Sequence, residues 1–596
     1  MQGKINNPPT AFLKSLFNSL PRRRRLQAIP LLGLMLLSSV AELVTIGAVV
    51  PFVAVLTHPE QAADLGWLNS ATASFGIAPS SDSLLFFAGL FIGLALLSML
   101  LRLVLNYATQ RWALMANYDL SVDLYQRMLS QPFLFHCRHN SSELMSALFK
   151  TEQVTRSVIQ SALQALVAVA LSLGIIAALL LIDPLIALSA GLLFALVYLV
   201  ISALVRLRLK RGGGAIAEMY TSRIQMLQEG LASIRDVMVD GREAQNLERY
   251  AALEYRLKKA QAEAQVLSSA PRYLVETLGI VILVVIAIVL IGQSDPPAAA
   301  LPVVGALALA AQRLLPQAQQ LYASWAGITG NRRIVEDVLK FQALARRNLN
   351  QRPPAPEGFG FQNAIRFEQV AFRYPDAAAP VLQGLNFEIR AGSRIGIIGE
   401  TGAGKSTLVD LILGLLEPTE GRVRIDDTVL DESCRRAWQD RLAHVPQALF
   451  LADASIAENI ALGEHREDID LERVRQAAAI ARLDKVIQGR PEGIWSRVGE
   501  RGIALSGGQR QRIGIARALY HQPDVLILDE ATNALDEATE REVVANLKRH
   551  RPELTLIIVT HRTESLRDCD RYIHIENRTA TVLEALPGAL SGIHRP

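Results

Sequence analysis

The stretch "RIGIIGETGAGKSTLVDLIL" (residues 394–413) places a glycine-rich loop between an apolar run and a segment with the apolar spacing of a helix. A strand, such a loop and a helix in this order form a phosphate-binding loop. The glycines let backbone N–H groups face phosphate oxygens, and the helix adds the positive end of its dipole. We therefore expect a nucleotide-phosphate site in an α/β fold. Its loop residues are Gly399, Glu400, Thr401, Gly402, Ala403, Gly404, Lys405, Ser406 and Thr407.

Several side chains are expected to act on the phosphates. Lys405 would reach the β- and γ-phosphates, and the Ser406 hydroxyl would hold Mg²⁺. The run "DVLILDEATNALD" (524–536) is a hydrophobic strand that ends in two carboxylates, at the sheet edge where phosphates bind. The first, Asp529, fits a ligand that holds Mg²⁺ through water. The second, Glu530, fits a general base that orients an attacking water.

Three further residues are candidates, each with a structural alternative. "TLIIVTHR" (555–562) is another buried strand that ends in His561 at the same edge, although a lone histidine can be purely structural. Gln447 follows "RLAHVP" and is placed to sense Mg²⁺ or the γ-phosphate, with a solvated loop glutamine as the alternative. Tyr374 follows the first strand of this half and is placed to stack on adenine, unless it is an ordinary tyrosine at a strand end.

A second glycine-bearing loop, "ALSGGQRQRIGIARAL" (504–519), precedes a basic segment with an apolar stripe. Its serine and glycines, followed by a helix start, again fit phosphate recognition. The chain thus carries two loops of phosphate-binding type. The residues alone do not say why both are needed.

The first 330 residues have a different composition from the rest. The chain has 596 residues, half of them hydrophobic, and single cores stop growing at about 250–300 residues. Because about 20 apolar residues span a bilayer as a helix, we predict six membrane spans. The first apolar run is longer than the about 7–15 residues of a signal-peptide core, so it is predicted to be a retained anchor. The predicted spans are 29–56, 84–106, 162–182, 185–205, 273–292 and 301–327.

Lysines and arginines predict the orientation of these spans. The connections 57–83, 183–184 and 293–300 contain none. Basic residues are concentrated instead in the cytoplasmic candidates, which are Arg22–Arg25, 107–161 and 206–272. The positive-inside rule then places both termini in the cytoplasm.

The two long inner connections have a helical pattern, so the membrane helices are expected to continue into the cytoplasm. Residues 130–144 and 230–245 break this pattern with small and turn-forming residues. They are candidates for short helices that touch the soluble half, with plain hairpin turns as the alternative. We expect a transmembrane domain at 1–345, a linker at 346–363 rich in proline and glycine, and an α/β domain with a largely parallel sheet at 364–596.

Charge and cysteine content limit the functional classes. A net charge of +4 is small for this length, so no nucleic-acid partner is expected. Cys137, Cys434 and Cys569 lack metal-like spacing, and they are expected to be reduced thiols of a cytoplasmic compartment.

Taken together, these motifs resemble those of the ATP-binding cassette (ABC) superfamily, and the six spans resemble an exporter half-transporter of MsbA-like architecture. The resemblance covers nearly the whole chain and includes "RVGERG" (497–502) and "LSGGQ" (505–509). It implies ATP and Mg²⁺ as cofactors, with Glu530, His561 and Gln447 in catalysis. It also implies that the second loop acts on ATP bound to another copy, through Ser506, Gly507, Gly508 and Gln509.

The resemblance therefore explains the two loops, because one chain completes no site alone. Lys405, Gln447, Ser506, Glu530 and His561 are all intact in this chain, so a homodimer is expected, and a heterodimer stays open. One departure is visible in "NALD" (533–536), where Asn533 stands at a position at which the family usually has serine. This change is expected to affect communication between sites more than nucleotide binding.

Three arginines in or beside the spans are substrate candidates: Arg102, Arg272 and Arg313. A charge at membrane depth requires a paired or cavity-facing position. Snorkelling or local pairing, as between Arg272 and Glu276, is the alternative. A cationic cavity suits an anionic amphiphile.

The first span loosely resembles that of PglK-type flippases, so a lipid-linked oligosaccharide in a bacterial inner membrane is the favoured substrate. Lipid A, a peptide or a drug are alternatives. An ATP-gated channel or regulator is the alternative of another class.

Overall fold

The computed structural model describes residues 9–48, 81–182, 184–293, 301–348, 355–560, 562 and 566–585. The chain forms two compact units. One contains Met1–Gln131 and Phe135–Asn348, and the other contains Pro132–Leu134 and Leu349–Pro596. The break after Asn348 falls inside the predicted linker. The two units are described separately.

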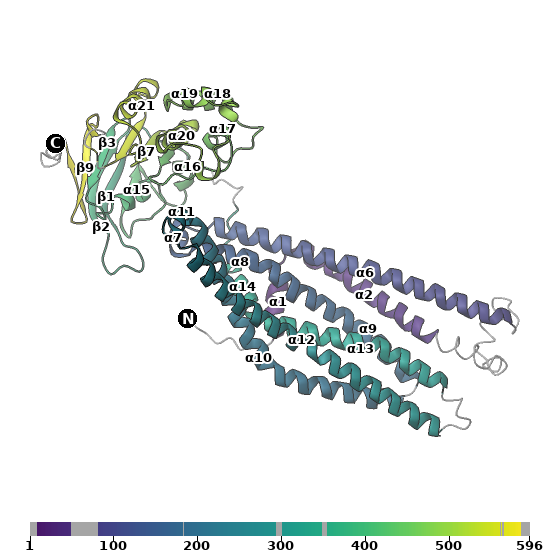
Figure 1. The fold of residues 1–596 in the computed structure, drawn as a ribbon. Coiled ribbons are helices and arrows are strands. Elements are labelled where there is room, and N and C mark those ends of the chain that lie inside the picture. Colours follow the sequence, from purple (N-terminus) through teal and green to yellow (C-terminus); the bar gives the residue numbers. More distant parts are fainter. Residues whose placement is uncertain are drawn as a thin grey trace. The chain divides into compact units, whose positions relative to one another are not determined.

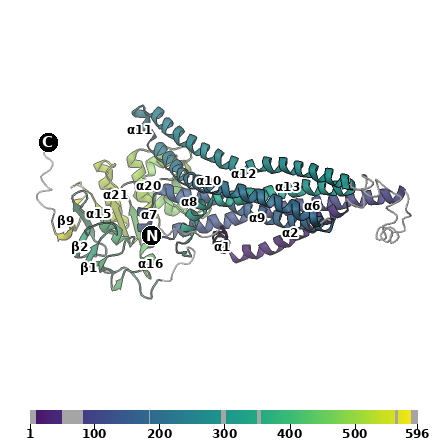
Figure 2. The same cartoon turned by 90° about the horizontal axis from the view of Figure 1, so that it is seen from below.

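The first unit consists of helices, and its longest ones run side by side (Figures 1 and 2). Each predicted span falls in a helix, although residues 49–56 of the first span lie outside the described residues. The helices are α1 (Pro9–Ser19), α2 (Arg22–Gly47), α6 (Ser81–Leu129), α7 (Phe133–Arg138), α8 (Ser141–Val154), the π-helix η1 (Thr155–Ile159), α9 (Gln160–Ile182), α10 (Pro184–Ala232), α11 (Ile234–Val239), α12 (Glu243–Gln293), α13 (Leu301–Gly330) and α14 (Arg332–Gln342).

The span-bearing helices α6, α10 and α12 extend well beyond a bilayer, as expected. The 49 residues of α6 reach about 73 Å at 1.5 Å per residue, whereas the hydrocarbon layer is about 30 Å thick. Within the part of the chain that the structure describes, four stretches are long and apolar enough to cross a membrane. They are Arg22–Thr45, Ala88–Leu129, Ser141–Ala177 and Glu243–Val289. The other two predicted spans lie in α10 and α13.

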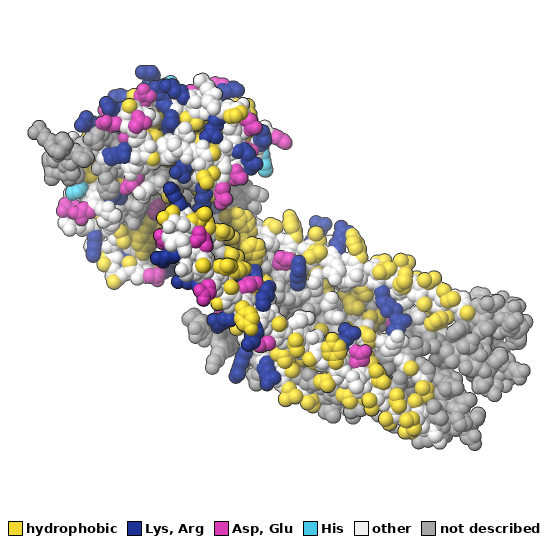
Figure 3. All heavy atoms as spheres, viewed as in Figure 1, with side chains coloured by type: hydrophobic (Ala, Val, Ile, Leu, Met, Phe, Trp, Pro, Cys, Tyr) yellow, Lys and Arg dark blue, Asp and Glu magenta, His cyan; other side chains and the backbone are white. Residues whose placement is uncertain are grey.

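The surface of this unit is apolar along the long helices (Figure 3). Large side chains on α6 and α12, such as Leu100 and Ile288, are more than half exposed. Soluble proteins rarely expose contiguous apolar patches of such extent. This surface is what a lipid environment requires.

Short helices occupy both segments that break the helical pattern. Residues 130–144 contain α7, and residues 230–245 contain α11, so both segments are more than hairpin turns. Pro132–Leu134 belong to the second compact unit, where Leu134 packs against a core cluster. Contact of the 130–144 segment with the soluble half stays a prediction.

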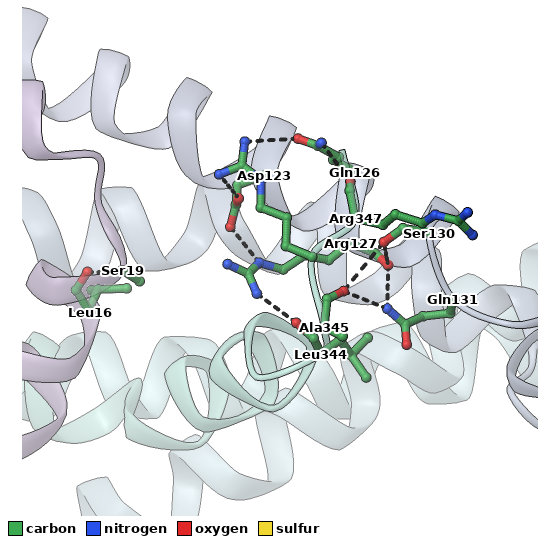
Figure 4. A network of polar contacts seen from close by, with 11 residues as sticks. Leu16, Ser19, Asp123, Gln126, Arg127, Ser130, Gln131, Leu344, Ala345 and Arg347 are labelled. Carbon is green, nitrogen blue, oxygen red and sulfur yellow. Dashed lines mark hydrogen bonds and ion pairs between the residues drawn. The ribbon is translucent and has the colours of Figure 1, made fainter. Parts of the chain in front are cut away.

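Polar contacts hold the chain that leaves α14 against the end of α6 (Figure 4). Arg127 donates to the Leu344 carbonyl at 2.6 Å, and Gln131 donates to the Ala345 carbonyl at 2.9 Å. Gln126 donates to the Arg347 carbonyl at 3.0 Å. The start of the linker therefore cannot move away from α6 without breaking these bonds.

The second unit combines two sheets with covering helices (Figure 1). The six-stranded sheet has the order β10-β9-β3-β8-β7-β6, with parallel pairs from β9 through β6. A four-stranded sheet has the order β2-β1-β4-β5, and its paired strands are antiparallel. The strands are β1 (Ala364–Phe372), β2 (Leu382–Arg390), β3 (Arg394–Gly399), β4 (Glu420–Ile425), β5 (Thr428–Val429), β6 (Leu442–Val445), β7 (Val525–Asp529), β8 (Thr555–Val559), β9 (Arg571–Glu576) and β10 (Thr579–Leu583).

The predicted α/β class is confirmed, and the separate antiparallel sheet is an addition to it. Central strands such as "TLIIV" of β8 are buried at every residue, as expected for a parallel sheet covered on both faces. The helices are α15 (Lys405–Ile412), α16 (Arg435–Gln439), α17 (Ile456–Ile460), α18 (Leu471–Ile480), α19 (Asp484–Gln488), α20 (Gly507–Tyr520) and α21 (Glu537–His550), with the 3₁₀ turns η3 (Gly493–Trp495) and η4 (Glu500–Gly502).

Candidate functional site

The phosphate loop connects β3 to α15, and its glycines have two different roles. Gly399, Gly402 and Gly404 all have positive φ, at 153°, 86° and 106°. A Cβ on Gly399 would lie 2.6 Å from the Ile575 carbonyl oxygen, and one on Gly404 would lie 2.9 Å from a Leu382 methyl. A Cβ on Gly402 would meet nothing within 4 Å. Packing therefore requires the outer two glycines, while the middle one leaves space on the loop.

Lys405 begins α15 and bends back across the loop. Its Nζ donates to the carbonyls of Gly399 at 2.8 Å and Glu400 at 2.9 Å, and the residue is only 9% exposed. Burial lowers the pKa of Lys405, and the charges of Glu530 and Asp529 partly oppose this effect. The ammonium is thus placed inside the loop, where phosphate oxygens can replace the two carbonyls.

Tyr374 lies beside the first turn of α15. Its hydroxyl is 3.4 Å from the Thr407 hydroxyl, and its ring packs edge-on against Phe372. The tyrosine is therefore next to the phosphate loop. Stacking on adenine stays a prediction.

Asp529 ends β7 and Glu530 follows it directly, as expected. Glu530 has a positive φ of 50°, a conformation that non-glycine residues adopt rarely and that clusters at functional sites. Gln447 donates its amide to Glu530 Oε2 at 2.7 Å. The structure thus brings the predicted sensor and the predicted base into direct contact.

Asn533 also contacts this carboxylate. Its Nδ2 donates to Glu530 Oε2 at 3.0 Å, and Arg562 donates to the Asn533 carbonyl at 2.7 Å. From the sequence, Asn533 was recognisable as a departure from the family, but its connection with Glu530 was not predicted. Its position three residues after the base was the available signal.

Removal of the Asn533 amide should slow hydrolysis without weakening nucleotide binding. We expect Asn533→Ala to lower kcat about tenfold, because a hydrogen bond to a charged group contributes about 1.5–3 kcal/mol. Asn533→Ser should behave alike, since its hydroxyl is too short to replace the amide. Steady-state kinetics should show an unchanged KM for ATP. Asn546→Ala is the control, because its half-buried amide on α21 donates to the Ile480 carbonyl at 3.4 Å and not to Glu530. A rise in KM with unchanged kcat for Asn533→Ala would contradict this role.

Asp410 is a site residue that the sequence analysis missed. It lies on α15, and burial together with the negative charge of Asp529 raises its pKa to about 6. Burial, and then Glu530, also raise the pKa of Asp529. Negative charge is therefore concentrated at this edge of the sheet.

The raised pKa of Asp410 predicts a pH-dependent stability. The protonated carboxyl favours the folded state, so its contribution is complete below the unfolded pKa of about 3.9 and is lost as pH rises to about 6. In nucleotide-free protein, Asp410→Asn should therefore unfold about 2–4 °C above the wild type at pH 7. The difference should vanish near pH 4. Thermal unfolding across this range measures it, and a pH-independent difference would contradict the assignment.

The donor chemistry at this edge fits Mg²⁺. Ser406, Gln447 and Asp529 supply oxygen atoms, the ligands that Mg²⁺ prefers beside substrate phosphates. The crowded carboxylates, whose repulsion contributes to the raised pKa of Asp529, would be relieved by a divalent cation. Bound there, Mg²⁺ would neutralise charge on the β- and γ-phosphates.

Comparisons with known proteins agree with this geometry. The ABC transporter family description matches residues 382–533, and the ABC transporter transmembrane region matches residues 45–308. An uncharacterized ABC transporter ATP-binding protein of Sinorhizobium fredii is 30% identical over 461 residues, which are 76% of this chain and 77% of that protein. The chain belongs to the ABC transporter family.

Other similar proteins refine this membership. An ATP-dependent lipid A-core flippase of Cupriavidus metallidurans is 29% identical over 524 residues, 85% of this chain and 86% of the flippase. That of Cupriavidus pinatubonensis is 37% identical, but the match covers only 40% of its length. A bacterial Atm1-family ABC exporter with ATP bound shares the fold at a TM-score of 0.75, with 22% identity over 94% of this chain and 95% of that one.

The predicted exporter half-transporter is thereby confirmed, and as an ABC exporter it couples ATP hydrolysis to transport. The expected closeness to flippases of lipid-linked oligosaccharides is not shown by these relatives.

The signature loop of this ABC exporter, residues 505–509, packs against the D-loop of the same chain, residues 533–536. Ser506 caps α20 in a reciprocal pair with Gln509. A Cβ on Gly508 would lie 2.9 Å from the Ala534 carbonyl oxygen, and Gln511 accepts from the Ala534 N–H at 2.9 Å. The signature loop and the D-loop of one chain are therefore in direct tertiary contact. Ser506, Gly507 and Gly508 as contacts to a second copy's ATP remain a prediction, and His561 lies outside the described residues.

The structure brings together two of the three substrate arginines. Arg102 on α6 and Arg313 on α13 each place a guanidinium nitrogen 2.6 Å from the carboxylate of Glu42 on α2. Arg272 instead lies 3.8 Å from Glu276 on its own helix, and both are at least half exposed. Glu42 was not among the residues predicted from the sequence, although a glutamate inside an apolar run was a visible signal.

Proposed function

We propose that this ABC exporter is a homodimer that moves a phosphate-bearing glycolipid across the bacterial inner membrane by alternating access. The observation that carries the proposal is the pair of arginines, Arg102 and Arg313, that converge from two helices of the membrane unit. Guanidinium groups bind phosphate through paired N–H donors. Two such groups on separate helices suit an anionic headgroup.

Polar side chains continue from Arg313 along α13. Gln320 lies seven residues later, which is about two helical turns and hence the same face. Gln320 donates to Gln164 of α9 at 2.8 Å, and Gln160 of α9 donates to Gln110 of α6 at 2.7 Å. Amides both donate and accept, so they match sugar hydroxyls. This stripe supports a saccharide in the headgroup.

Two lipid classes share a phosphate and a saccharide. Lipid-linked oligosaccharides are favoured by the resemblance of the first span, and lipid A is favoured by the names of the similar flippases. We place lipid-linked oligosaccharides first and lipid A second. Peptides and hydrophobic cations lack the phosphate and rank below both.

The ATP site implies the coupling. ATP would be held by the phosphate loop of one copy and by Ser506, Gly507, Gly508 and Gln509 of the second. Glu530 would accept a proton from the attacking water, and Gln447 and Asn533 would orient its carboxylate. With ATP bound, the ATP-binding units of the two copies would be held together, and they would separate after hydrolysis. Both termini would lie in the cytoplasm, as the basic residues of the inner connections predict.

Reconstitution into liposomes tests the proposal. Lipid-linked oligosaccharide, lipid A, a peptide and a hydrophobic cation should be compared for ATP-dependent translocation. Transport of one of the two glycolipids, and of neither the peptide nor the cation, is the expected result. Preferred transport of the cation would overturn the proposed substrate class.

A further inference from the structure

Glu42 is the centre of an ion cluster that joins three helices of the membrane unit. Its carboxylate is 3% exposed. Arg102 contacts one oxygen, Oε2, and Arg313 contacts the other, Oε1, each at 2.6 Å. The Ser98 hydroxyl also donates to Oε2, at 3.0 Å. Both carboxylate oxygens are therefore engaged.

The charges of this cluster do not balance. Two guanidinium groups and one carboxylate leave a formal charge of +1. A charge within a membrane is costly unless it is paired, so Glu42 is what makes two adjacent arginines tolerable there. The arginine side chains are nevertheless 40% and 38% exposed. The cluster thus combines a buried anion with two accessible cations.

We propose that Glu42 is an internal counter-ion that occupies Arg102 and Arg313 until the phosphate of the transported lipid replaces it. This inference rests on the proposed function. Carboxylate and phosphate bind arginine through the same paired N–H donors. The carboxylate therefore acts as a competitor that every anionic headgroup must displace.

The competitor sets a charge threshold. A phosphodiester carries one negative charge, as Glu42 does, so it gains little by taking the place of the carboxylate. A phosphomonoester carries about −1.5 to −2 at pH 7, and a diphosphate is comparably charged. Glu42 thereby excludes the phosphodiester lipids that surround the protein and admits a more highly charged headgroup.

The displaced carboxylate also needs partners, because an unpaired buried charge is strongly destabilising. Ser98 already donates to it. Ser38 lies one helical turn earlier on α2, is fully buried, and has no hydrogen-bond partner among the residues that the structure describes. This hydroxyl is a second donor available to Glu42.

The test compares two lipids on the full-length protein in phosphatidylcholine nanodiscs. Undecaprenyl diphosphate represents the highly charged headgroup, and phosphatidylglycerol represents the phosphodiester. The mole fraction of lipid that half-maximally stimulates ATP hydrolysis is measured for each. For the wild type, we expect a value at least tenfold lower for the diphosphate. Equal values for the two lipids in the wild type would overturn the inference, whereas the liposome comparison of glycolipids tests the proposed function separately.

Glu42→Gln removes the competing charge and keeps the shape. For this variant, the mole fraction of lipid that half-maximally stimulates ATP hydrolysis should fall about tenfold for both lipids, so that phosphatidylglycerol becomes effective. Glu42→Asp retains the charge and should keep the wild-type threshold. Glu276→Gln is the matched control, because the structure pairs Glu276 with Arg272 of its own helix at 3.8 Å. Unchanged or higher values for Glu42→Gln, with wild-type thermal stability, would overturn the inference.

Two uncompensated arginines could prevent folding of Glu42→Gln, and a second variant covers that outcome. The double variant Glu42→Gln with Arg102→Gln restores the formal charge of +1. It leaves Arg313 without a competing carboxylate. Phosphatidylglycerol should still stimulate it at a lower fraction than the wild type requires. A wild-type threshold in this double variant would contradict the role of Glu42.

Discussion

The Glu530→Gln protein is expected to bind ATP like the wild type and to hydrolyse it at about one hundredth of the wild-type rate or less. A glutamine at this position keeps an oxygen that can accept from Gln447 and Asn533, which both contact Glu530 Oε2. It cannot accept the proton of the attacking water, and general-base catalysis contributes about 10²–10⁴-fold. Nucleotide binding and single-turnover hydrolysis measure the two effects separately.

This variant should also accumulate as a dimer whose two ATP-binding units stay together, because hydrolysis is the step that separates them. Cross-linking between the two copies in the presence of ATP would detect the pair. Glu537→Gln, which removes an exposed carboxylate paired with Arg541 at 3.5 Å, is the control and should turn over normally. Wild-type turnover of the Glu530→Gln protein would exclude Glu530 from the mechanism.

Arg313→Ala should lower transport of the anionic lipid about tenfold or more and leave basal ATP hydrolysis intact. The substitution removes one of two guanidinium groups, and a charge-assisted hydrogen bond contributes about 1.5–3 kcal/mol. Glu42 keeps Arg102 as a partner at 2.6 Å, so the helix bundle retains a paired carboxylate. Translocation and ATP hydrolysis in the same liposomes measure the two activities.

Arg272→Ala is the natural comparison for this variant. Arg272 lies 61% exposed beside Glu276 and apart from the Glu42 cluster, so its loss should reduce transport less. An equal loss of lipid transport in the two variants would show that Arg272 contributes to transport as much as Arg313 does. Unaffected transport in Arg313→Ala would remove Arg313 from substrate binding.

Features encoded by neighbouring residues could be predicted from the sequence. The phosphate loop needs only a strand, three glycines and a helix start, all within residues 394–413. The carboxylates of Asp529 and Glu530 follow directly from the end of a buried strand. The long helices followed from apolar and helical periodicity. These elements form where predicted because the local pattern and the tertiary structure agree.

Contacts between distant residues could not be predicted in this way. Glu42 pairs with Arg313 across 271 positions of the chain, and no local pattern encodes that distance. Asn533 looked like a small departure in a loop, because its hydrogen bond to Glu530 Oε2 becomes visible only in the folded structure. In the sequence, Asp410 cannot be distinguished from an ordinary polar residue on a helix. Its proximity to Asp529 arises from the packing of α15 beside β7.

The antiparallel sheet was missed for a related reason. β1 was expected as a strand, but its partners β2 and β4 are set by pairing rather than by composition. Alternating apolar residues fit either sheet type at an edge. The number of sheets therefore depended on pairing between strands, which periodicity does not encode.

ATP-dependent flux of one glycolipid with and without its phosphate is the most direct test of phosphate-dependent transport. A lipid-linked oligosaccharide and a synthetic analogue that joins the same glycan to the same lipid without the diphosphate would be placed in identical liposomes, and the headgroups on the inner and outer sides would be counted. We predict ATP-dependent translocation of the phosphorylated lipid and at least tenfold slower movement of the other. Equal rates for the two lipids, or equal rates with the Glu530→Gln protein, would contradict the proposed function.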